Sequence, residues 1–272
     1  MQNIERIGLI AGNGRFPLLL AENALRKKIR IICLAIKGDT NPKIKKYVDE
    51  IYWFRVREFS KMISKMKGLG LTNVVMAGQI NPFHLFTGEV FMDIELSKLI
   101  KQLRDRRADT IFSAIVQRLE EDGINVLPSH AYMGDYIPPV GVFSKLKPTE
   151  EEWQDFFFGK TVAKEIGRLD IGQTVVVKGK TVLSVEAFEG TNRCIARGGF
   201  LAKDALVVKM SKPNQDMRFD VPVVGIKTIK AMAYSGCKGI AVEAGKTIVI
   251  DKDRVLRAVD RLGMLFVALQ GA

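Results

Sequence analysis

Residues 7–17 read Ile7-Gly8-Leu9-Ile10-Ala11-Gly12-Asn13-Gly14-Arg15-Phe16-Pro17. A short apolar run that ends at a glycine predicts a buried strand, and the amphipathic stretch from Phe16 to Lys28 predicts a helix after it. The apolar run from Arg30 to Ile36 predicts a second strand. A strand, a helix and a strand in this order form the repeating unit of a doubly wound parallel sheet.

The same alternation continues along the chain. We expect a helix over 58–67, a strand over 73–77, a helix over 110–121 and a strand over 124–127. Turn-rich patches at 136–141 and 147–150 then predict a linker or hinge. The chain is therefore expected to be α/β, with an N-terminal doubly wound, Rossmann-like domain (1–140) joined by a hinge to a smaller α/β C-terminal domain (141–272).

The C-terminal part begins with a clear helix start. Thr149 is a good N-cap residue, and Glu150 to Glu152 place acids in the first turn, so a helix should run to about Arg168. Beyond it we expect a hairpin of strands 174–177 and 181–186, strands 206–210, 239–243 and 247–250, and helices 225–235 and 251–261. This pattern is typical of a second α/β domain.

Composition narrows the class of protein. The 272 residues are 47% hydrophobic and 26% charged, as in a folded globular protein. A formal charge of +12 attracts polyanions, but the basic residues are spread along the chain without a nucleic-acid-binding motif. Solvated helix faces are the favoured interpretation of the basic runs, and we expect no nucleic-acid partner.

The cysteine and histidine content bears on compartment and metal. Cys33, Cys194 and Cys237 lack paired spacing, which favours a reducing cytoplasm. The sequence contains no stretch of 18 or more apolar residues, so we expect no membrane-spanning helix. With only His84 and His130, a zinc site of the usual ligands is hard to build. Oxygen ligands, and hence Mg²⁺ or Mn²⁺, are expected for any bound metal.

Two glycine loops follow predicted strands. The loop Gly12-Asn13-Gly14 precedes the first helix, where backbone amides favour a bound phosphate. NAD binding and a tight structural turn are the alternatives, although Pro17 replaces the third glycine of a dinucleotide fingerprint. The second loop reads Ala77-Gly78-Gln79-Ile80-Asn81-Pro82. Because strand ends of a parallel sheet meet at one edge, Gly12 and Gly78 should face one crevice, unless the second loop is only a turn.

Two acid-bearing segments are candidates for chemistry. Glu186 and Glu189 flank a strand-to-helix turn, as metal ligands or as a capped helix start. Residues 209–222 carry Asp216 and Asp220 together with Lys209, Lys212 and Arg218. Such a mixture suits carboxylates on Mg²⁺ and cations on phosphate, although a solvated loop held by ion pairs is the alternative. Glu243 is either a ligand or the end of a hairpin.

Together these segments resemble one family. The strand and glycine loop at 7–17, the run from Glu186 to Gly190, and the sequences "KPNQDMRFDVP" and "GIAVEAGKT" are similar to the two-domain UDP-2,3-diacylglucosamine pyrophosphatases of lipid A biosynthesis, the type unrelated to calcineurin-like phosphoesterases. The resemblance covers nearly the whole chain. It implies hydrolysis of a lipidated UDP-sugar to UMP and 2,3-diacylglucosamine 1-phosphate, aided by Mg²⁺.

The resemblance also implies roles for individual residues. Asp220 matches the essential metal-binding, catalytic carboxylate, with Asp216, Glu186 and Glu189 as further metal candidates. The expected substrate-binding residues are Gly12, Asn13, Gly14, Gly78, Gln79, Lys209, Lys212 and Arg218. The family usually has a basic residue where this chain has Gln79, which puts a phosphate contact there in doubt. Asp109 takes the place of a family acid that heads a helix, and an N-cap is its expected role.

The partners follow from the same resemblance. They are the lipidated sugar nucleotide and the cytoplasmic face of the inner membrane, bound peripherally with help from the +12 charge. A homo-oligomer is one option. Two rival functions stay open: a non-catalytic sugar-nucleotide or lipid-binding module, and an NAD-dependent oxidoreductase. The missing third glycine, and the missing acid after the second strand, disfavour the oxidoreductase.

Overall fold

The computed structural model describes residues 6–80, 89–105, 107–213 and 215–271. Asn81, Pro82 and Asn214, which belong to the motifs quoted above, lie outside the described residues. The chain forms two compact units. Unit 1 contains residues 1–133 and the short segment Asp216–Asp220, and unit 2 contains residues 134–215 and 221–272. The division thus falls before the expected boundary at 140, and unit 1 takes in five residues from late in the sequence.

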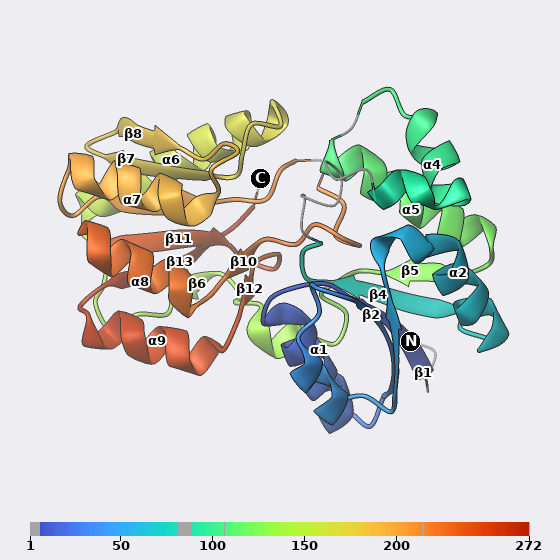
Figure 1. The fold of residues 1–272 in the computed structure, drawn as a ribbon. Helices are drawn as coiled ribbons and strands as arrows, with labels where there is room; N and C mark the ends of the chain where they lie inside the picture. The colour runs from blue at the N-terminus through green and yellow to red at the C-terminus, as the bar shows by residue number, and fades with distance from the viewer. Residues whose placement is uncertain (1–5, 81–88, 106, 214, 272) are drawn as a thin grey trace. The chain divides into compact units, whose positions relative to one another are not determined.

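Unit 1 is built on a five-stranded sheet (Figure 1). The strands are β1 (Arg6–Ala11), β2 (Arg30–Ile36), β3 (Glu50–Phe54), β4 (Asn73–Ala77) and β5 (Asn125–Leu127), and the helices are α1 (Phe16–Arg26), α2 (Phe59–Gly68), α4 (Ile94–Lys101) and α5 (Ala108–Glu121). All neighbouring strands pair in parallel, in the order β3-β2-β1-β4-β5. This is the doubly wound, Rossmann-like sheet that the sequence predicts.

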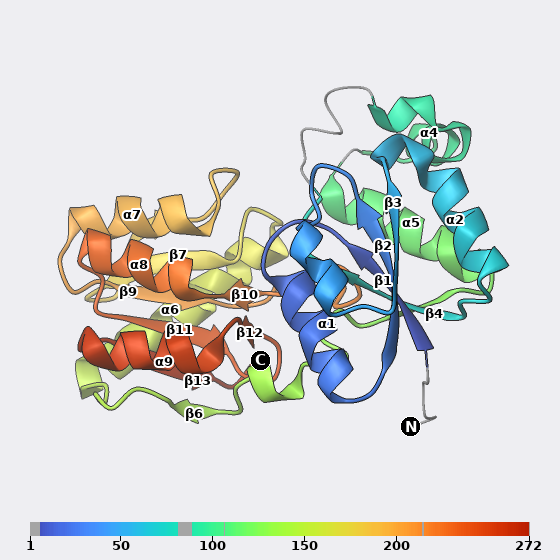
Figure 2. The ribbon, with the colours of Figure 1, turned by 60° about the horizontal axis from the view of Figure 1, so that its bottom comes forward.

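Helices cover both faces of this sheet. In Figures 1 and 2, α1 lies on one face and α2 and α5 on the other. One face is packed by side chains from α2, α4 and α5, including Met66, Ile100 and Leu119, against Ile10 and Val74 of the strands. Strands covered on both faces read as continuous apolar runs, as β1 and β2 do.

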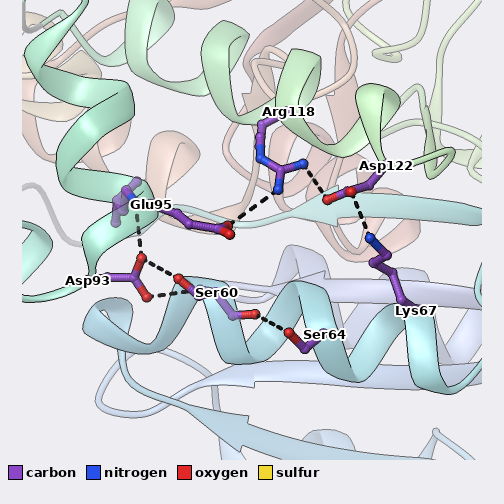
Figure 3. Close-up of polar contacts among 8 residues, drawn as sticks. Ser60, Ser64, Lys67, Asp93, Glu95, Arg118 and Asp122 are labelled. Atoms are coloured by element: carbon purple, nitrogen blue, oxygen red, sulfur yellow. Dashed lines mark hydrogen bonds and ion pairs between the residues drawn. The ribbon is translucent and has the colours of Figure 1, made fainter.

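A polar cluster ties α2, α4 and α5 together (Figure 3). Asp93 caps α4 by accepting a hydrogen bond from Leu96 N at 3.0 Å, and it also accepts bonds from Ser60 N at 2.9 Å and Ser60 Oγ at 2.6 Å in α2. Arg118 of α5 pairs with Asp122 and lies 3.5 Å from Glu95 of α4. Together with the ion pair of Lys67 in α2 and Asp122, these contacts hold α5, which lines the pocket described below, against α2 and α4.

Unit 2 contains a six-stranded mixed sheet in the order β6-β13-β11-β9-β7-β8. Its strands are β6 (Gly141–Val142), β7 (Thr174–Lys178), β8 (Thr181–Val185), β9 (Leu206–Lys209), β11 (Gly239–Glu243) and β13 (Leu265–Leu269), and a separate parallel pair is formed by β10 (Val223–Val224) and β12 (Ile248–Val249). Only the central strands β9, β11 and β13 are mutually parallel, while β6, β7 and β8 pair antiparallel.

Two helix layers cover the sheet of unit 2. The helices are α6 (Glu150–Arg168), α7 (Thr191–Leu201), α8 (Ile226–Ser235) and α9 (Lys252–Arg261). Phe156 of α6 packs on one face of the sheet, and Ile195, Met232 and Val259 of the other three helices pack on the opposite face. Figures 1 and 2 show α7, α8 and α9 side by side in that order. The expected second α/β domain is confirmed.

Short 3₁₀ turns and caps complete both units. The turns are η1 (Pro42–Lys46), η2 (Val56–Glu58), η3 (Glu89–Met92) and η4 (Gly134–Tyr136). The predicted start of α6 is confirmed, because Thr149 is its N-cap and forms a capping box with Glu152. Thr149 Oγ1 accepts from Glu152 N at 3.3 Å, and Thr149 N donates to the Glu152 carboxylate at 2.8 Å.

Candidate active site

The two glycine loops of unit 1 lie against each other at the carboxyl end of the sheet. Gly12 N donates to Ala77 O at 2.8 Å, and Asn13 N donates to Gln79 O at 2.7 Å. A Cβ on Gly12 would lie 2.5 Å from Gln79 O, and one on Gly78 would lie 2.5 Å from Asn13 O. Gly78 also has φ +84°, which only glycine adopts readily. The predicted meeting of Gly12 and Gly78 is therefore confirmed, and close backbone contact explains both glycines.

This ladder limits how the first loop can bind an anion. The amides of Gly12 and Asn13 already donate to carbonyl oxygens of the second loop. They are not available to a phosphate unless the loops separate. The exposed side chain of Asn13 and the exposed backbone at Gly14, at the start of α1, are the parts of this loop that face solvent. A ligand of this loop must therefore use those groups.

Beside the loops lies a pocket of about 240 Å³, formed entirely by residues of unit 1. Its apolar lining includes Ile10, Met76, Ile80, Phe112 and Phe219. Its polar side chains are Gln79, Asp109 and Asp220, with Gly12 and Gly78 at the backbone edge. Ligands of open α/β sheets bind at this edge, outside the carboxyl ends of the strands.

Asp220 reaches the pocket because the segment 216–220 is attached to unit 1. Ser129 is the main anchor: its backbone N donates to Met217 O at 2.7 Å, and its Oγ lies 2.6 Å from Met76 O and 2.7 Å from Arg218 O. The ring of Phe219 stacks on Phe112 of α5, with centroids 5.7 Å apart. The segment thus carries both an apolar wall and a carboxylate into the pocket.

Asp216 and Arg218 hold each other within the same segment. Arg218 donates to the Asp216 carboxylate from both Nε and a terminal nitrogen, and its other terminal nitrogen donates to Glu120 of α5 at 2.7 Å. Burial opposes ionisation of Asp216, but the bonds from Arg218 outweigh it and lower the Asp216 pKa. Both side chains, expected on metal and phosphate respectively, serve here to dock the segment.

Asp109 differs from its expected role. The N-cap of α5 is Arg107 and the helix begins at Ala108, so the N-cap prediction for Asp109 was wrong. Asp109 lies inside the first turn, and its half-buried side chain lines the pocket with Asp220. An acid in the first turn of a helix interacts favourably with the helix dipole, so acids are common there. In the sequence, a metal-binding or catalytic acid at this position therefore looks the same as an ordinary acid at a helix start.

The other predicted site residues belong to unit 2, where each has a partner. Thr191 Oγ1 donates to Glu186 at 2.6 Å and accepts from Lys209 Nζ at 2.8 Å. Lys212 pairs with Asp170 at 2.7 Å. Arg197 lies 2.6 Å from Glu189, and its hydrogen bond lowers the pKa of that carboxyl. To meet a phosphate or a metal, Lys212 and Glu189 would have to leave these partners.

Glu243 is a structural acid. It is fully buried, and its Oε2 accepts hydrogen bonds from Ser211 N at 2.9 Å, Ser211 Oγ at 2.6 Å and Lys164 Nζ at 2.7 Å. Lys246 lies 2.9 Å from Oε1. Burial alone would raise its pKa, but these donors lower it to about 2. Glu243 therefore stabilises unit 2 as an anion at neutral pH.

The oxygen atoms of the side chains that line the pocket suit a hard cation such as Mg²⁺. Within the described residues, no three His, Cys, Asp or Glu side chains gather to hold a metal ion by themselves. Mg²⁺ needs fewer protein ligands, because it is commonly held by one or two carboxylates together with water and substrate phosphate. Asp109, Asp220 and the amide oxygen of Gln79 offer oxygen atoms of this kind.

A doubly wound sheet with a carboxylate-bearing pocket at its carboxyl edge, followed by a mixed α/β unit, defines a two-domain ligand-binding α/β protein. Comparison with known families narrows this class. The model of the LpxI N-terminal domain matches residues 6–136, and that of the LpxI C-terminal domain matches residues 139–267. The chain belongs to the LpxI family.

A curated relative agrees with this assignment. The UDP-2,3-diacylglucosamine pyrophosphatase LpxI of Caulobacter vibrioides is 30% identical over 272 residues, which cover 96% of each chain. The resemblance drawn from the sequence motifs is thereby confirmed. Among the residues that the structure places, no helix is both long and apolar enough to cross a membrane.

Solved structures add little. Leucoanthocyanidin reductase with NADPH from Vitis vinifera is 17% identical, with a TM-score of 0.28, over 53% of this chain and 40% of that one. The biotin carboxylase domain of Hydrogenobacter thermophilus 2-oxoglutarate carboxylase is 12% identical, with a TM-score of 0.31, over 66% and 36%. Likenesses this weak carry no conclusion about this chain.

Proposed function

We propose that this protein hydrolyses the pyrophosphate bond of UDP-2,3-diacylglucosamine, in lipid A biosynthesis. Water adds to phosphorus, the bridging P–O bond breaks, and UMP and 2,3-diacylglucosamine 1-phosphate are the products. The observation that carries the proposal is Asp220: it belongs to a segment that resembles the family and lines a pocket of unit 1 together with a second carboxylate, Asp109. Membership of the LpxI family and the name of the Caulobacter relative support the same reaction.

We assign Asp220 and Asp109 to metal binding in this reaction. When bound, Mg²⁺ neutralises phosphate oxygens and lowers the barrier to attack by water. That both carboxylates line one pocket supports a shared ion, and in this proposal Asp220 could also accept a proton from water. Mn²⁺ would satisfy the same oxygen ligands.

The rest of the pocket orients the substrate. Gln79 offers an amide where the family usually has a basic residue, so it suits a hydroxyl or phosphate oxygen better than an ion pair. The rings of Phe112 and Phe219 make one wall of the pocket apolar. Electrostatic stabilisation is stronger beside such a low-dielectric wall than in bulk water.

In this proposal two basic residues of unit 2, Lys209 and Lys212, bind phosphate of the substrate. Lys209 and Lys212 already bond to Thr191 and Asp170, so phosphate binding by them would exchange one oxygen partner for another. Such an exchange costs less than stripping a bare ammonium of water. Glu186 and Glu189 are weaker metal candidates, because Glu189 is paired with Arg197 and Glu186 accepts from Thr191.

The proposed setting is the cytoplasm, with the protein bound peripherally to the inner membrane. A diacylated substrate resides in a bilayer, and a chain with formal charge +12 is attracted to anionic lipid. Peripheral binding would bring the pocket to its substrate.

The test is release of UMP from UDP-2,3-diacylglucosamine dispersed in detergent, measured by chromatography. The natural protein is assayed with Mg²⁺ and with EDTA, and the variant Asp220→Ala is assayed with Mg²⁺. We expect magnesium-dependent UMP from the natural protein and almost none from the variant. UMP in EDTA at the full rate would exclude the metal role. No UMP from the natural protein, with retained binding of the sugar nucleotide, would favour a non-catalytic binding module instead.

A further inference from the structure

The helix layer of unit 2 formed by α7, α8 and α9 carries a basic groove that the proposed reaction does not use. It has a volume of about 670 Å³ and is lined by Lys145, Lys230, Arg254, Arg257 and Arg261, from the segment after β6, from α8 and from α9. One acid, Asp260, lines it as well. The groove therefore concentrates positive charge at one place on the surface.

The sequence of α9 explains why its arginines gather. Arg254, Arg257 and Arg261 are spaced by three and four residues, which puts them on one side of a helix. Val255 and Val259, on the other side, are fully buried against the sheet. The arginines are consequently all exposed, and Lys230 of α8 adds to them from the neighbouring helix.

The charges of this groove are not neutralised within the described part of the chain. None of its five basic side chains forms an ion pair or hydrogen bond with a described residue. Asp260 is engaged by the backbone N of Lys145, which donates to it at 2.8 Å. A concave surface with one sign of charge focuses its field and attracts anions.

An apolar edge adjoins the groove on the same helix layer. Tyr234 follows Lys230 by one turn of α8 and is 78% exposed. Its ring meets that of Phe200, at the end of α7, edge to face at 5.5 Å, and Leu201 beside it is 66% exposed. Aromatic side chains with a polar tip, next to cations, are typical of surfaces that lie at a lipid–water interface.

We propose that this face, the helix layer α7–α8–α9 with its basic groove and its apolar edge, docks on a bilayer containing anionic phospholipid. The cations bind headgroup phosphates, while Phe200, Leu201 and Tyr234 enter the interfacial region. The exposed leucine and phenylalanine favour lipid over a nucleic acid, whose hydrated backbone gives such side chains no apolar environment. The inference rests on the proposed function, since a diacylated substrate gives the protein a reason to bind a bilayer.

The test is co-sedimentation of the full chain with vesicles, without substrate. One set contains phosphatidylcholine alone, and the other contains one part phosphatidylglycerol to two parts phosphatidylcholine. We expect binding to the anionic set that weakens at high salt. The triple variant Arg254→Gln, Arg257→Gln, Arg261→Gln should bind about a hundredfold less, because each cation near an anionic membrane contributes a factor of about five.

A matched control separates the groove from overall charge. The variant Lys43→Gln, Lys45→Gln, Lys46→Gln removes the same charge from exposed lysines of η1 in unit 1 and should bind as the natural protein does. Thermal melting of both variants checks that they fold. Undiminished binding by the arginine variant, equal loss in the two variants, or binding to duplex DNA without binding to vesicles would each overturn the proposal.

A second readout keeps this inference distinct from the proposed reaction. UMP release from detergent-dispersed substrate should be unchanged in the arginine variant, whereas release from substrate embedded in anionic vesicles should fall with vesicle binding. If the arginine variant binds vesicles normally and the natural protein releases UMP, the docking surface is refuted and the reaction stands. If the arginine variant loses vesicle binding but the natural protein releases no UMP, the docking surface is supported and the reaction is refuted.

Discussion

The two units of this protein use acidic side chains in opposite ways. In unit 2, Glu243 is fully buried and receives donors from Ser211 and Lys164, with Lys246 beside it. In unit 1, Asp109 and Asp220 are half-buried and line a pocket. A carboxylate enclosed by donors of its own unit is held inside the protein, whereas a carboxylate at a pocket wall can be reached by a ligand.

The comparison also separates position in a motif from role. Glu243 and Asp220 both belong to segments that resemble the family, and both follow or adjoin strand ends. Only their surroundings distinguish the residue that holds unit 2 together, Glu243, from the residue proposed to meet the substrate, Asp220. Substitutions should therefore affect stability in one case and turnover in the other.

The largest effect is expected at Asp220. Asp220→Asn keeps the size of the side chain but removes the charge that would hold Mg²⁺, so UMP release should fall about a thousandfold, or about 4 kcal/mol. Asp109→Asn should lower release as well, by a smaller factor. The free energy of unfolding should change by less than about 1 kcal/mol for either variant, because both side chains are only half-buried.

This prediction is checked by UMP release at a Mg²⁺ concentration that just saturates the natural protein, and by urea unfolding of the same preparations. If Asp220→Asn or Asp109→Asn lost UMP release only in proportion to a loss of stability, these acids would act on stability as Glu243 does, and the contrast between the two units would be wrong. Recovery of Asp220→Asn at high Mg²⁺ would identify a metal ligand, since a lost proton acceptor would not be restored that way.

The next effect belongs to Glu243. Glu243→Gln should lower the free energy of unfolding of unit 2 by about 3 kcal/mol, because Lys164, 14% exposed, would keep its charge without a buried partner. The exposed pair of Glu165 and Arg168 on the same helix offers the control, and Glu165→Gln should cost less than about 0.5 kcal/mol.

Fluorescence can follow unit 2 alone in this experiment. Trp153 lies on α6, and the variant Trp53→Phe removes the tryptophan of unit 1. Equal costs for Glu243→Gln and Glu165→Gln in that background would mean that burial of the Glu243 network contributes nothing to stability.

The fold was largely predictable where local pattern and tertiary pairing agree. β1, α1 and β2 follow from apolar runs closed by glycine and by a basic turn, and β4 and β11 lie where the sequence places them. β13 (Leu265–Leu269) and β3 (Glu50–Phe54) were not predicted, although β13 pairs with the central strand β11. Their strand state depends on neighbours distant in the sequence, which no short window contains.

The site shows the same limit. The meeting of Gly12 and Gly78 was predictable, because parallel strands end at one edge. The attachment of residues 216–220 to unit 1 was not, since it depends on Ser129 and on the stacking of Phe219 against Phe112. Those partners are separated from the segment by many residues and carry no local signal.

Acid should weaken unit 2 through Glu243. Its pKa is about 2 in the folded protein against 4.5 for the free side chain, so the stabilisation is complete above about pH 4.5 and is lost as the pH falls through the folded value. A loss of about 2 kcal/mol is expected between neutral pH and about pH 3. Urea unfolding followed by Trp153 should show it, and Glu243→Gln should remove that part of the pH dependence.

The smallest effect tests how the segment 216–220 reaches the pocket. Ser129→Ala removes a buried hydroxyl beside Met76 O and Arg218 O, which should cost unit 1 about 1 kcal/mol. Because the segment carries Asp220, UMP release should fall about tenfold as well. Ser64→Ala is the control: its exposed hydroxyl only returns to Ser60 O of the same helix, so stability and release should stay as they are. A loss of stability in Ser129→Ala without loss of release would mean that Asp220 reaches its position through Phe219 and Arg218 alone.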